Sequence, residues 1–131
     1  MSIPSDILLS IAIPTKNRQH YLQILVDELL TSCRKDFEIV IEDNSDTDSL
    51  RQWAEAKNDL RLKYNHHADW ISVIDNCDQA LLNCRGDFVC MLGDDDGIML
   101  DEALTCMSDA RRDEVDAVMS PVLNYIWPAL D

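Results

Sequence analysis

Basic residues and glycine are both scarce in this sequence of 131 residues, which has 11 Lys and Arg, 25 Asp and Glu, and 3 Gly. The formal net charge of −14 creates a negative field that repels phosphate backbones, so no nucleic-acid partner is expected. The glycines form neither the G-x-G-x-x-G pattern nor the P-loop pattern. Dinucleotide sites of that type and P-loop ATPase sites are thereby excluded.

Paired cysteines and a long apolar segment are missing as well. The 5 cysteines are an odd set without a C-x-x-C pair, which argues against a disulfide framework and a structural zinc site. The apolar run near the N-terminus is broken by Ser10 and ends at Pro14, so it is too short for a signal peptide or a membrane span. We expect a cytoplasmic protein, in the cytosol or at the inner face of the membrane.

The rest of the composition is that of one globular domain, which we expect over residues 1–131. Apolar runs predict strands at 7–13, 37–41, 60–64, 88–92 and 115–119, and helical spacing predicts helices at 19–33, 48–58, 70–84 and 101–112. Strands that alternate with helices indicate the α/β class, with a Rossmann-like, mostly parallel central sheet. The strand at 60–64 is assigned to the sheet edge.

Local signals predict where some elements end and which side they bury. Pro14 is expected to end the first strand, Asp101 to cap the last helix, and one of residues 45–47 to cap the helix at 48–58. The apolar stripe of the helix at 70–84 consists of Ile71, Ile74, Cys77, Leu81 and Cys84.

Ligands of parallel sheets bind beyond the carboxyl ends of the strands, where the strand order reverses. This rule selects the loops 14–18, 42–47 and 93–97. The first loop carries Lys16 and Arg18, two cations that can contact a phosphate or a nucleotide.

The third loop contains three consecutive aspartates, Asp94, Asp95 and Asp96, after an apolar strand. Like charges this close oppose one another's ionisation, and a bound cation removes that cost. Carboxylate oxygens suit Mg²⁺ or Mn²⁺, which complete their shells with water and phosphate oxygens. The alternative is a solvated acidic turn in which Gly97 supplies a positive φ.

The second loop places Glu42 and Asp43 at the carboxyl end of another strand, so two acidic clusters are expected to converge at one edge of the sheet. An aspartate there can accept a hydrogen bond from a base N–H or a ribose hydroxyl. Helix capping by Asp43, Ser45 or Asp46 is the structural alternative, and it is compatible with binding.

Three motifs occur in order: IAIPTKNR at 11–18, IVIEDNS at 39–45 and GDFVCMLGDDD at 86–96. Together they resemble the amino-terminal, nucleotide-sugar-binding portion of the family 2 glycosyltransferases, over about residues 7–120. The resemblance implies a GT-A three-layer sandwich and a nucleotide-diphosphate sugar donor. It also implies a divalent cation, Mn²⁺ or Mg²⁺, held by a D-x-D-type motif, and transfer of the sugar to an acceptor hydroxyl with inversion.

The resemblance assigns Asp43 to the base, and the aspartate run to the metal and the diphosphate. The nucleotide-sugar-binding residues expected on this basis are Pro14, Thr15, Lys16, Arg18, Asp43, Asn76, Asp94 and Asp95, and the metal ligands are Asp94, Asp95 and Asp96. Lys16 stands where many relatives have an aromatic residue that stacks on the base. The nucleotide therefore stays open, with a UDP-sugar favoured.

The general base belongs to the acceptor half of this family and is expected beyond Asp131. Residues 125–131 read as a strand entering another element, so we expect a chain truncated before that half, from an enzyme of surface polysaccharide or glycoconjugate synthesis. The acceptor is then a glycan or a lipid-linked glycan. The alternatives are a nucleotide-diphosphate-binding module or inactive fragment and, more remotely, a phospho-acceptor signalling domain, which needs a lysine where Ser120 and Pro121 stand.

Overall fold

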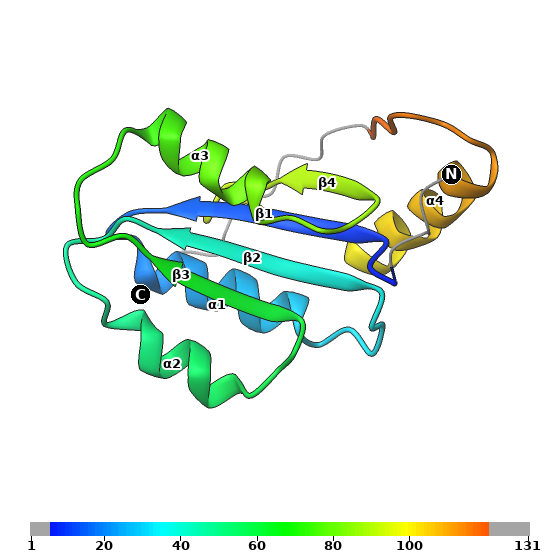
Figure 1. The fold of residues 1–131 in the computed structure, drawn as a ribbon. Coiled ribbons are helices and arrows are strands. Elements are labelled where there is room, and N and C mark those ends of the chain that lie inside the picture. Colours follow the sequence, from blue (N-terminus) through cyan, green and yellow to red (C-terminus); the bar gives the residue numbers. More distant parts are fainter. Residues whose placement is uncertain (1–5, 121–131) are drawn as a thin grey trace.

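The computed structural model describes residues 6–120, in which strands and helices alternate (Figure 1). The elements are β1 (Leu9–Thr15), α1 (Gln19–Leu29), β2 (Phe37–Asp43), α2 (Leu50–Lys57), β3 (Leu62–His66), α3 (Val73–Leu82), β4 (Phe88–Met91) and α4 (Leu100–Arg112). The predicted α/β class is confirmed. In this part of the chain, no helix is long and apolar enough to cross a membrane.

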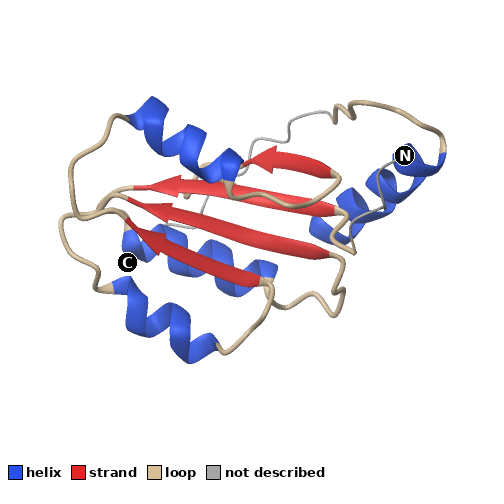
Figure 2. Ribbon diagram, in the orientation of Figure 1, coloured by secondary structure: helices blue, strands red, loops and turns tan. Residues whose placement is uncertain are grey.

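The sheet is parallel throughout, with the spatial order β3-β2-β1-β4. The chain moves outward from β1 through β2 to β3 at the predicted edge, and then returns to place β4 on the other side of β1. Right-handed crossovers put the helices before and after such a reversal on opposite faces. Figure 2 shows this arrangement, with α3 on one face and α1 and α2 on the other. The reversal point lies between β1 and β4.

The sheet face toward α1, α2 and α4 forms the hydrophobic core. Alternate residues of the two central strands, such as Ile11 and Ile39, are fully buried there. The buried stripe of α1 consists of Leu22, Leu25, Val26 and Leu29. Burial of one side chain of this size contributes about 1.5–3 kcal/mol, so this face supplies most of the driving force for folding.

The opposite sheet face, beneath α3, carries charged groups. Ser10 and Glu38 are fully buried, and the Ser10 hydroxyl donates to Glu38 Oε1 at 2.6 Å. Lys63 of β3 pairs with Glu38 Oε2, and the backbone N–H of Arg85 donates to Oε1 at 2.7 Å. Burial is the largest single influence on this carboxyl and opposes its charge, but these donors together outweigh it and lower the pKa of Glu38.

The lowered pKa of Glu38 predicts a loss of stability in acid. A carboxyl whose pKa is lower in the folded than in the unfolded chain stabilises the fold above its unfolded pKa, and that contribution disappears as the pH falls through the folded value. The free energy of unfolding should therefore decrease as the pH falls below about 4.5. Urea unfolding between pH 6 and pH 3 measures this, with Glu38→Gln as the comparison. The prediction is contradicted if the difference in the free energy of unfolding between the wild type and Glu38→Gln does not decrease in acid.

Two strands extend further toward the C-terminus than the sequence predicted. β1 continues through Pro14, and β2 includes Glu42 and Asp43, which were expected in a turn. The Thr15 carbonyl accepts a hydrogen bond from the Asn44 N–H beyond β2, so the nitrogen of Pro14 faces the β4 side. Pairing with β4 has already ended at Ala12, so the missing N–H of proline costs no sheet hydrogen bond.

The buried side of α3 also differs from the predicted stripe. α3 buries Asn76 and Ala80, whereas Ile74 is 73% exposed and Leu81 is 43% exposed. Asn76 is the residue that suits the sheet face beneath α3, because that face offers hydrogen-bond partners. Ile74 and Leu81 therefore lie on the exposed side of the helix, whereas the other members of the predicted stripe, Ile71, Cys77 and Cys84, are half-buried.

Two helix ends and one strand were predicted wrongly. α2 and α4 follow Ser49 and Met99, neither of which makes a side-chain cap, so neither residues 45–47 nor Asp101 caps a helix. Asp101 instead accepts a hydrogen bond from Ser32 Oγ at 2.6 Å. Residues 115–119 do not form the predicted strand, because they are exposed and pair with no described strand. The expected strand at 125–131 lies outside the described residues.

Candidate functional site

The candidate site lies at the carboxyl ends of β1 and β4, on either side of the reversal point. Thr15 ends β1, and its buried hydroxyl donates to Asp94 Oδ2 at 2.7 Å. Arg18 places Nε 3.3 Å from Asp94 Oδ1 and Nη2 2.6 Å from Asp95 Oδ2. The structure thus joins the first and third predicted loops through four of the predicted site residues.

Residues 93–96 form a tight acidic turn, in which the Asp96 N–H donates to the Gly93 carbonyl at 3.1 Å. A Cβ atom on Gly93 would lie 2.5 Å from Asp96 Oδ2 and 3.3 Å from Asp95 Oδ1, so two carboxylates fold back over this glycine. Asp94 is only 6% exposed. Gly97 does not have the positive φ that the solvated-turn alternative required.

Carboxylate oxygens of this turn are hard ligands of the kind that Mg²⁺ and Mn²⁺ prefer. The described residues contain no group of three or more His, Cys, Asp and Glu side chains that could hold a metal unaided. Cations at phosphate sites need only one or two protein carboxylates, because water and phosphate oxygens supply the other ligands. Asp94 and Asp95 fit such a cation, whose shell a diphosphate would complete.

Asn17 fastens the first loop to the second. Its backbone N–H donates to Ser45 Oγ at 2.7 Å, and its side-chain amide both donates to Asp46 Oδ2 and accepts from the Asp46 N–H, each at 3.0 Å. Asn17 has φ 55°, a left-handed conformation that asparagine tolerates better than most residues. Sequence reasoning did not single out Asn17, although asparagine after a strand is a signal for this conformation.

We predict that Asn17→Ala lowers the free energy of unfolding by about 1–2 kcal/mol, because it removes the amide hydrogen bonds and strains a left-handed backbone. Asn17→Gly relieves the strain but not the lost hydrogen bonds, so its effect should be smaller. Urea unfolding of the three proteins compares them. If both variants are as stable as the wild type, Asn17 does not hold the two loops together.

Asp43 is fully buried and lies between Ser45 and Tyr64. Its Oδ1 accepts from the Ser45 N–H at 2.8 Å and from the Ser45 hydroxyl at 2.5 Å, and its Oδ2 accepts from the Tyr64 hydroxyl at 2.6 Å. Burial, and secondly the bond to Asp43, raise the pKa of the Tyr64 hydroxyl well above its usual range. Tyr64 therefore remains a neutral donor, and Asp43 orients the second loop.

Asn76 and Glu42 connect α3 to the carboxyl end of β2. Asn76 Nδ2 donates to the Glu42 carbonyl at 3.0 Å and lies 3.5 Å from the Thr15 carbonyl. Its Oδ1 is buried without a hydrogen-bond partner in the described part of the chain. The Glu42 carboxylate has no exposed surface, and Asn65, Asn83 and His67 contact it. An orphaned acceptor such as Asn76 Oδ1 suits a donor from a ligand or water.

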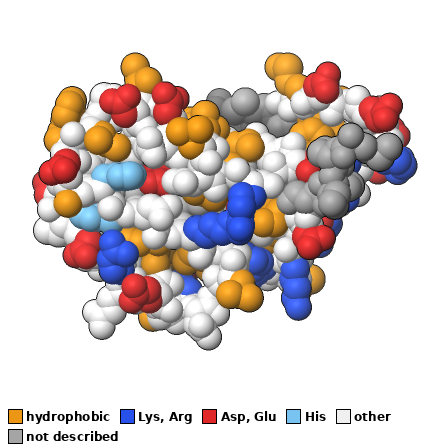
Figure 3. Space-filling view, viewed as in Figure 1, with side chains coloured by type: hydrophobic (Ala, Val, Ile, Leu, Met, Phe, Trp, Pro, Cys, Tyr) orange, Lys and Arg blue, Asp and Glu red, His pale blue; other side chains and the backbone are white. Residues whose placement is uncertain are grey.

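The remaining predicted residues lie at the rim. Lys16 is exposed and Pro14 is half-buried at the end of β1. Asp96 is exposed on the acidic turn. In Figure 3, acidic and histidine side chains gather at the left end of the molecule, where the arrows of β1, β2 and β3 finish in Figure 1.

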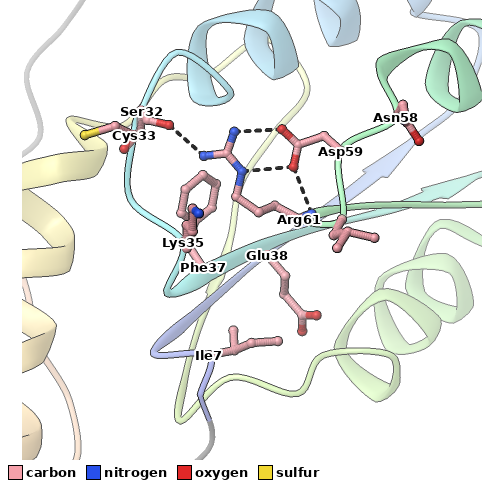
Figure 4. A pocket seen from close by; sticks show the side chains of 10 residues that line it. Ile7, Ser32, Cys33, Lys35, Phe37, Glu38, Asn58, Asp59 and Arg61 are labelled. Atoms are coloured by element: carbon pink, nitrogen blue, oxygen red, sulfur yellow. Dashed lines mark hydrogen bonds and ion pairs between the residues drawn. The ribbon is translucent and has the colours of Figure 1, made fainter.

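A cavity of about 590 Å³ lies at the other end of the strands from the candidate site, where Phe37 begins β2 (Figure 4). Arg61 in its wall donates to both Asp59 oxygens and to the carbonyls of Leu30, Ser32 and Arg34. The guanidinium is thus committed to the fold, which disfavours this cavity as a phosphate site.

Comparison with known proteins gives one family. The family model described as glycosyl transferase family 2 matches residues 10–129. A curated relative from Campylobacter jejuni, named GalNAc(5)-diNAcBac-PP-undecaprenol beta-1,3-glucosyltransferase, is 30% identical over 107 residues, which are 79% of this chain and 35% of the relative.

Solved structures of similar fold include TarS 1–349 from S. aureus, with a TM-score of 0.68 and 24% identity over 80% of this chain and 33% of TarS 1–349. A complex of the same protein with UDP-GlcNAc has a TM-score of 0.68 and 22% identity, over 82% and 32% of the two chains. The mannosyltransferase PcManGT from Pyrobaculum calidifontis, in complex with GDP-Man and Mn²⁺, has a TM-score of 0.61 and 21% identity, over 78% and 32%. The chain spans about a third of the length of these proteins.

Proposed function

Because the chain belongs to glycosyl transferase family 2, we propose that it forms the donor-binding part of an enzyme that transfers a sugar from a nucleotide-diphosphate sugar to an acceptor hydroxyl. The observation that carries this proposal is the contact of Thr15 and Arg18 with Asp94 at the reversal point of the sheet. That point is where open α/β sheets bind nucleotides. The chain has the GT-A fold of the transferases it resembles.

Each group at this point has a role in holding the diphosphate. Asp94 and Asp95 would hold a divalent cation, and the Thr15 hydroxyl keeps Asp94 in a single orientation. Such a cation supplies positive charge where negative charge accumulates on the departing diphosphate, and so stabilises the transition state more than the ground state. Arg18 supplies a guanidinium that can bind phosphate oxygens in a bidentate manner.

The base and the sugar are assigned to the neighbouring groups. Asn76 Oδ1, which no described residue contacts by a hydrogen bond, can accept one from a hydroxyl or N–H of the nucleotide sugar. Asp43 can accept from a base N–H only when Ser45 or Tyr64 gives up one of its present bonds, because the carboxylate is fully buried beneath them. Pro14 and Lys16 lie beside this site, at and just after the end of β1.

The finer assignments rest on what the similar proteins bind. UDP-GlcNAc occupies one structural relative and GDP-Man with Mn²⁺ another, and the name of the curated relative contains a lipid-linked sugar. We assign a UDP-sugar donor, an inverting transfer, and a glycan or lipid-linked glycan acceptor at the inner face of the membrane, in surface polysaccharide or glycoconjugate synthesis. The general base and the acceptor wall are assigned to a further part of the protein, as the share of the relatives' length covered here suggests.

Calorimetric titration of this chain with UDP, GDP, CDP and dTDP, each with and without Mn²⁺, tests the donor site. The expected result is binding of UDP that requires Mn²⁺. Binding of none of the four by the folded chain contradicts a donor site formed by this part alone. Binding without transfer by the longer protein would favour the module that binds nucleotide diphosphates without turnover.

A further inference from the structure

The hydrogen bond and the ion pairs that the structure gives the Arg18 side chain all lie within the acidic turn. Its Nη2 contacts Asp95 Oδ2 at 2.6 Å and its Nε contacts Asp94 Oδ1 at 3.3 Å. The other oxygen of Asp94 accepts from the Thr15 hydroxyl. Of the two oxygens of Asp94, the most buried aspartate of the turn, one therefore accepts a hydrogen bond and the other is paired with a cation.

The charges of the turn explain why a cation stays there. Asp94, Asp95 and Asp96 bring three negative charges within one turn, and Arg18 offsets one of them in a chain whose net charge is −14. The bond to Asp95, and secondly the charge of Asp94, raise the pKa of Arg18 further, so it is permanently charged. A free divalent cation meets oxygens whose charge is partly neutralised, and it is repelled by the guanidinium.

The Arg18 side chain is also free to move away from the two aspartates. Its side chain is 44% exposed, and its Cζ lies 5.1 Å from the centre of the Tyr21 ring, a cation–π contact that does not depend on the aspartates. Asp95 is 48% exposed, so this ion pair is held loosely. A small rotation can therefore redirect the guanidinium without unfolding the loop.

We propose that Arg18 is a built-in counter-cation of the acidic turn. In this proposal the guanidinium leaves Asp94 and Asp95 only when a diphosphate is present to bind it, and the carboxylate oxygens then become ligands of a divalent cation. This inference rests on the proposed donor site. This exchange makes the cation and the diphosphate bind cooperatively, because the diphosphate supplies ligands to the cation and also draws the competing guanidinium of Arg18 away. By linkage, the cation strengthens diphosphate binding by the same factor.

The test is the affinity of this chain for Mn²⁺ alone, measured by calorimetry and by the electron paramagnetic resonance of unbound Mn²⁺. Arg18→Gln is expected to bind Mn²⁺ about tenfold more tightly than the wild type, as removal of one repelling charge at close range implies. In the same variant, UDP should strengthen Mn²⁺ binding by a smaller factor than in the wild type. Arg18→Lys keeps the charge but cannot bridge two aspartates, so its affinity for Mn²⁺ should lie between those of the wild type and Arg18→Gln.

Arg112→Gln is the matched control, because it changes the net charge equally but removes an arginine that pairs with Asp109 and Asp113 on and after α4. It should bind Mn²⁺ as the wild type does. Equal Mn²⁺ affinities of Arg18→Gln and the wild type, or an equal gain in Arg112→Gln, would overturn the counter-cation role. Absence of Mn²⁺-dependent UDP binding in the wild type would instead contradict the proposed function, whatever the Mn²⁺-only comparison gives.

Discussion

Asp94→Asn is expected to weaken Mn²⁺-dependent binding of UDP by about 100-fold or more, which exceeds the typical effect of losing a group that merely orients a metal ligand. Asp94 is the least exposed of the three aspartates, and Thr15 and Arg18 both fix its carboxylate. An amide is a far weaker ligand for a hard cation, and it also removes one negative charge from the turn. Calorimetry with Mn²⁺ and UDP measures the loss.

Two further variants make this expectation specific. Asp95→Asn should have a smaller effect, because Asp95 is half exposed and has neither the burial of Asp94 nor a contact with Thr15. Asp109→Asn changes the charge equally on the exposed face of α4 and should leave UDP binding unchanged. Equal affinities of Asp94→Asn and Asp109→Asn would show that the acidic turn does not hold the diphosphate.

Glu42→Ala is expected to lower the free energy of unfolding by about 3 kcal/mol, the magnitude typical of leaving the partners of a buried charge unpaired. The Glu42 carboxylate is fully buried. Its Oε1 accepts from Asn65 Nδ2 at 2.8 Å and from Asn83 Nδ2, and its Oε2 lies 2.6 Å from His67 Nε2. These contacts tie β3 and the end of α3 to the centre of the sheet.

Urea unfolding followed by circular dichroism measures this loss. Glu55→Ala, at an exposed position of α2, is the control and should change the free energy of unfolding by less than about 0.5 kcal/mol. Glu42→Gln keeps the volume of the side chain but places an NH₂ donor against the donors that now contact the carboxylate, so it should also destabilise the protein. Losses below about 1 kcal/mol in both Glu42 variants would mean that water replaces the carboxylate without cost.

Much of the site could be predicted because the carboxyl ends of parallel strands meet at one edge of a sheet. Asp94, Asp95, Thr15 and Arg18 were expected to share that edge, and direct contacts join them. The contribution of Asn17 was missed, because its role depends on Asp46 and Ser45 from another loop. The burial of Asp43 beneath Ser45 and Tyr64 was missed for the same reason.

The differences in the fold share one physical cause. Glu42 and Asp43 were assigned to an acidic, turn-forming segment, yet they continue a buried strand, where partners from β3 and from the end of α3 satisfy Glu42. Ile74 and Leu81 were grouped as an apolar stripe, yet α3 turns Asn76 toward the polar sheet face instead. Such partners are distant in sequence, so no local pattern contains them.

The sequence by itself determined the alternation of strands and helices, the α/β class and the three loops that could form a site, because apolar periodicity and chain-local turn signals encode them. Tertiary structure alone decided that the second sheet face is polar, and that Arg18 offsets one of the three charges of the acidic turn. Burial of a charge depends on which donors the fold brings within about 3 Å, and strand order sets those distances.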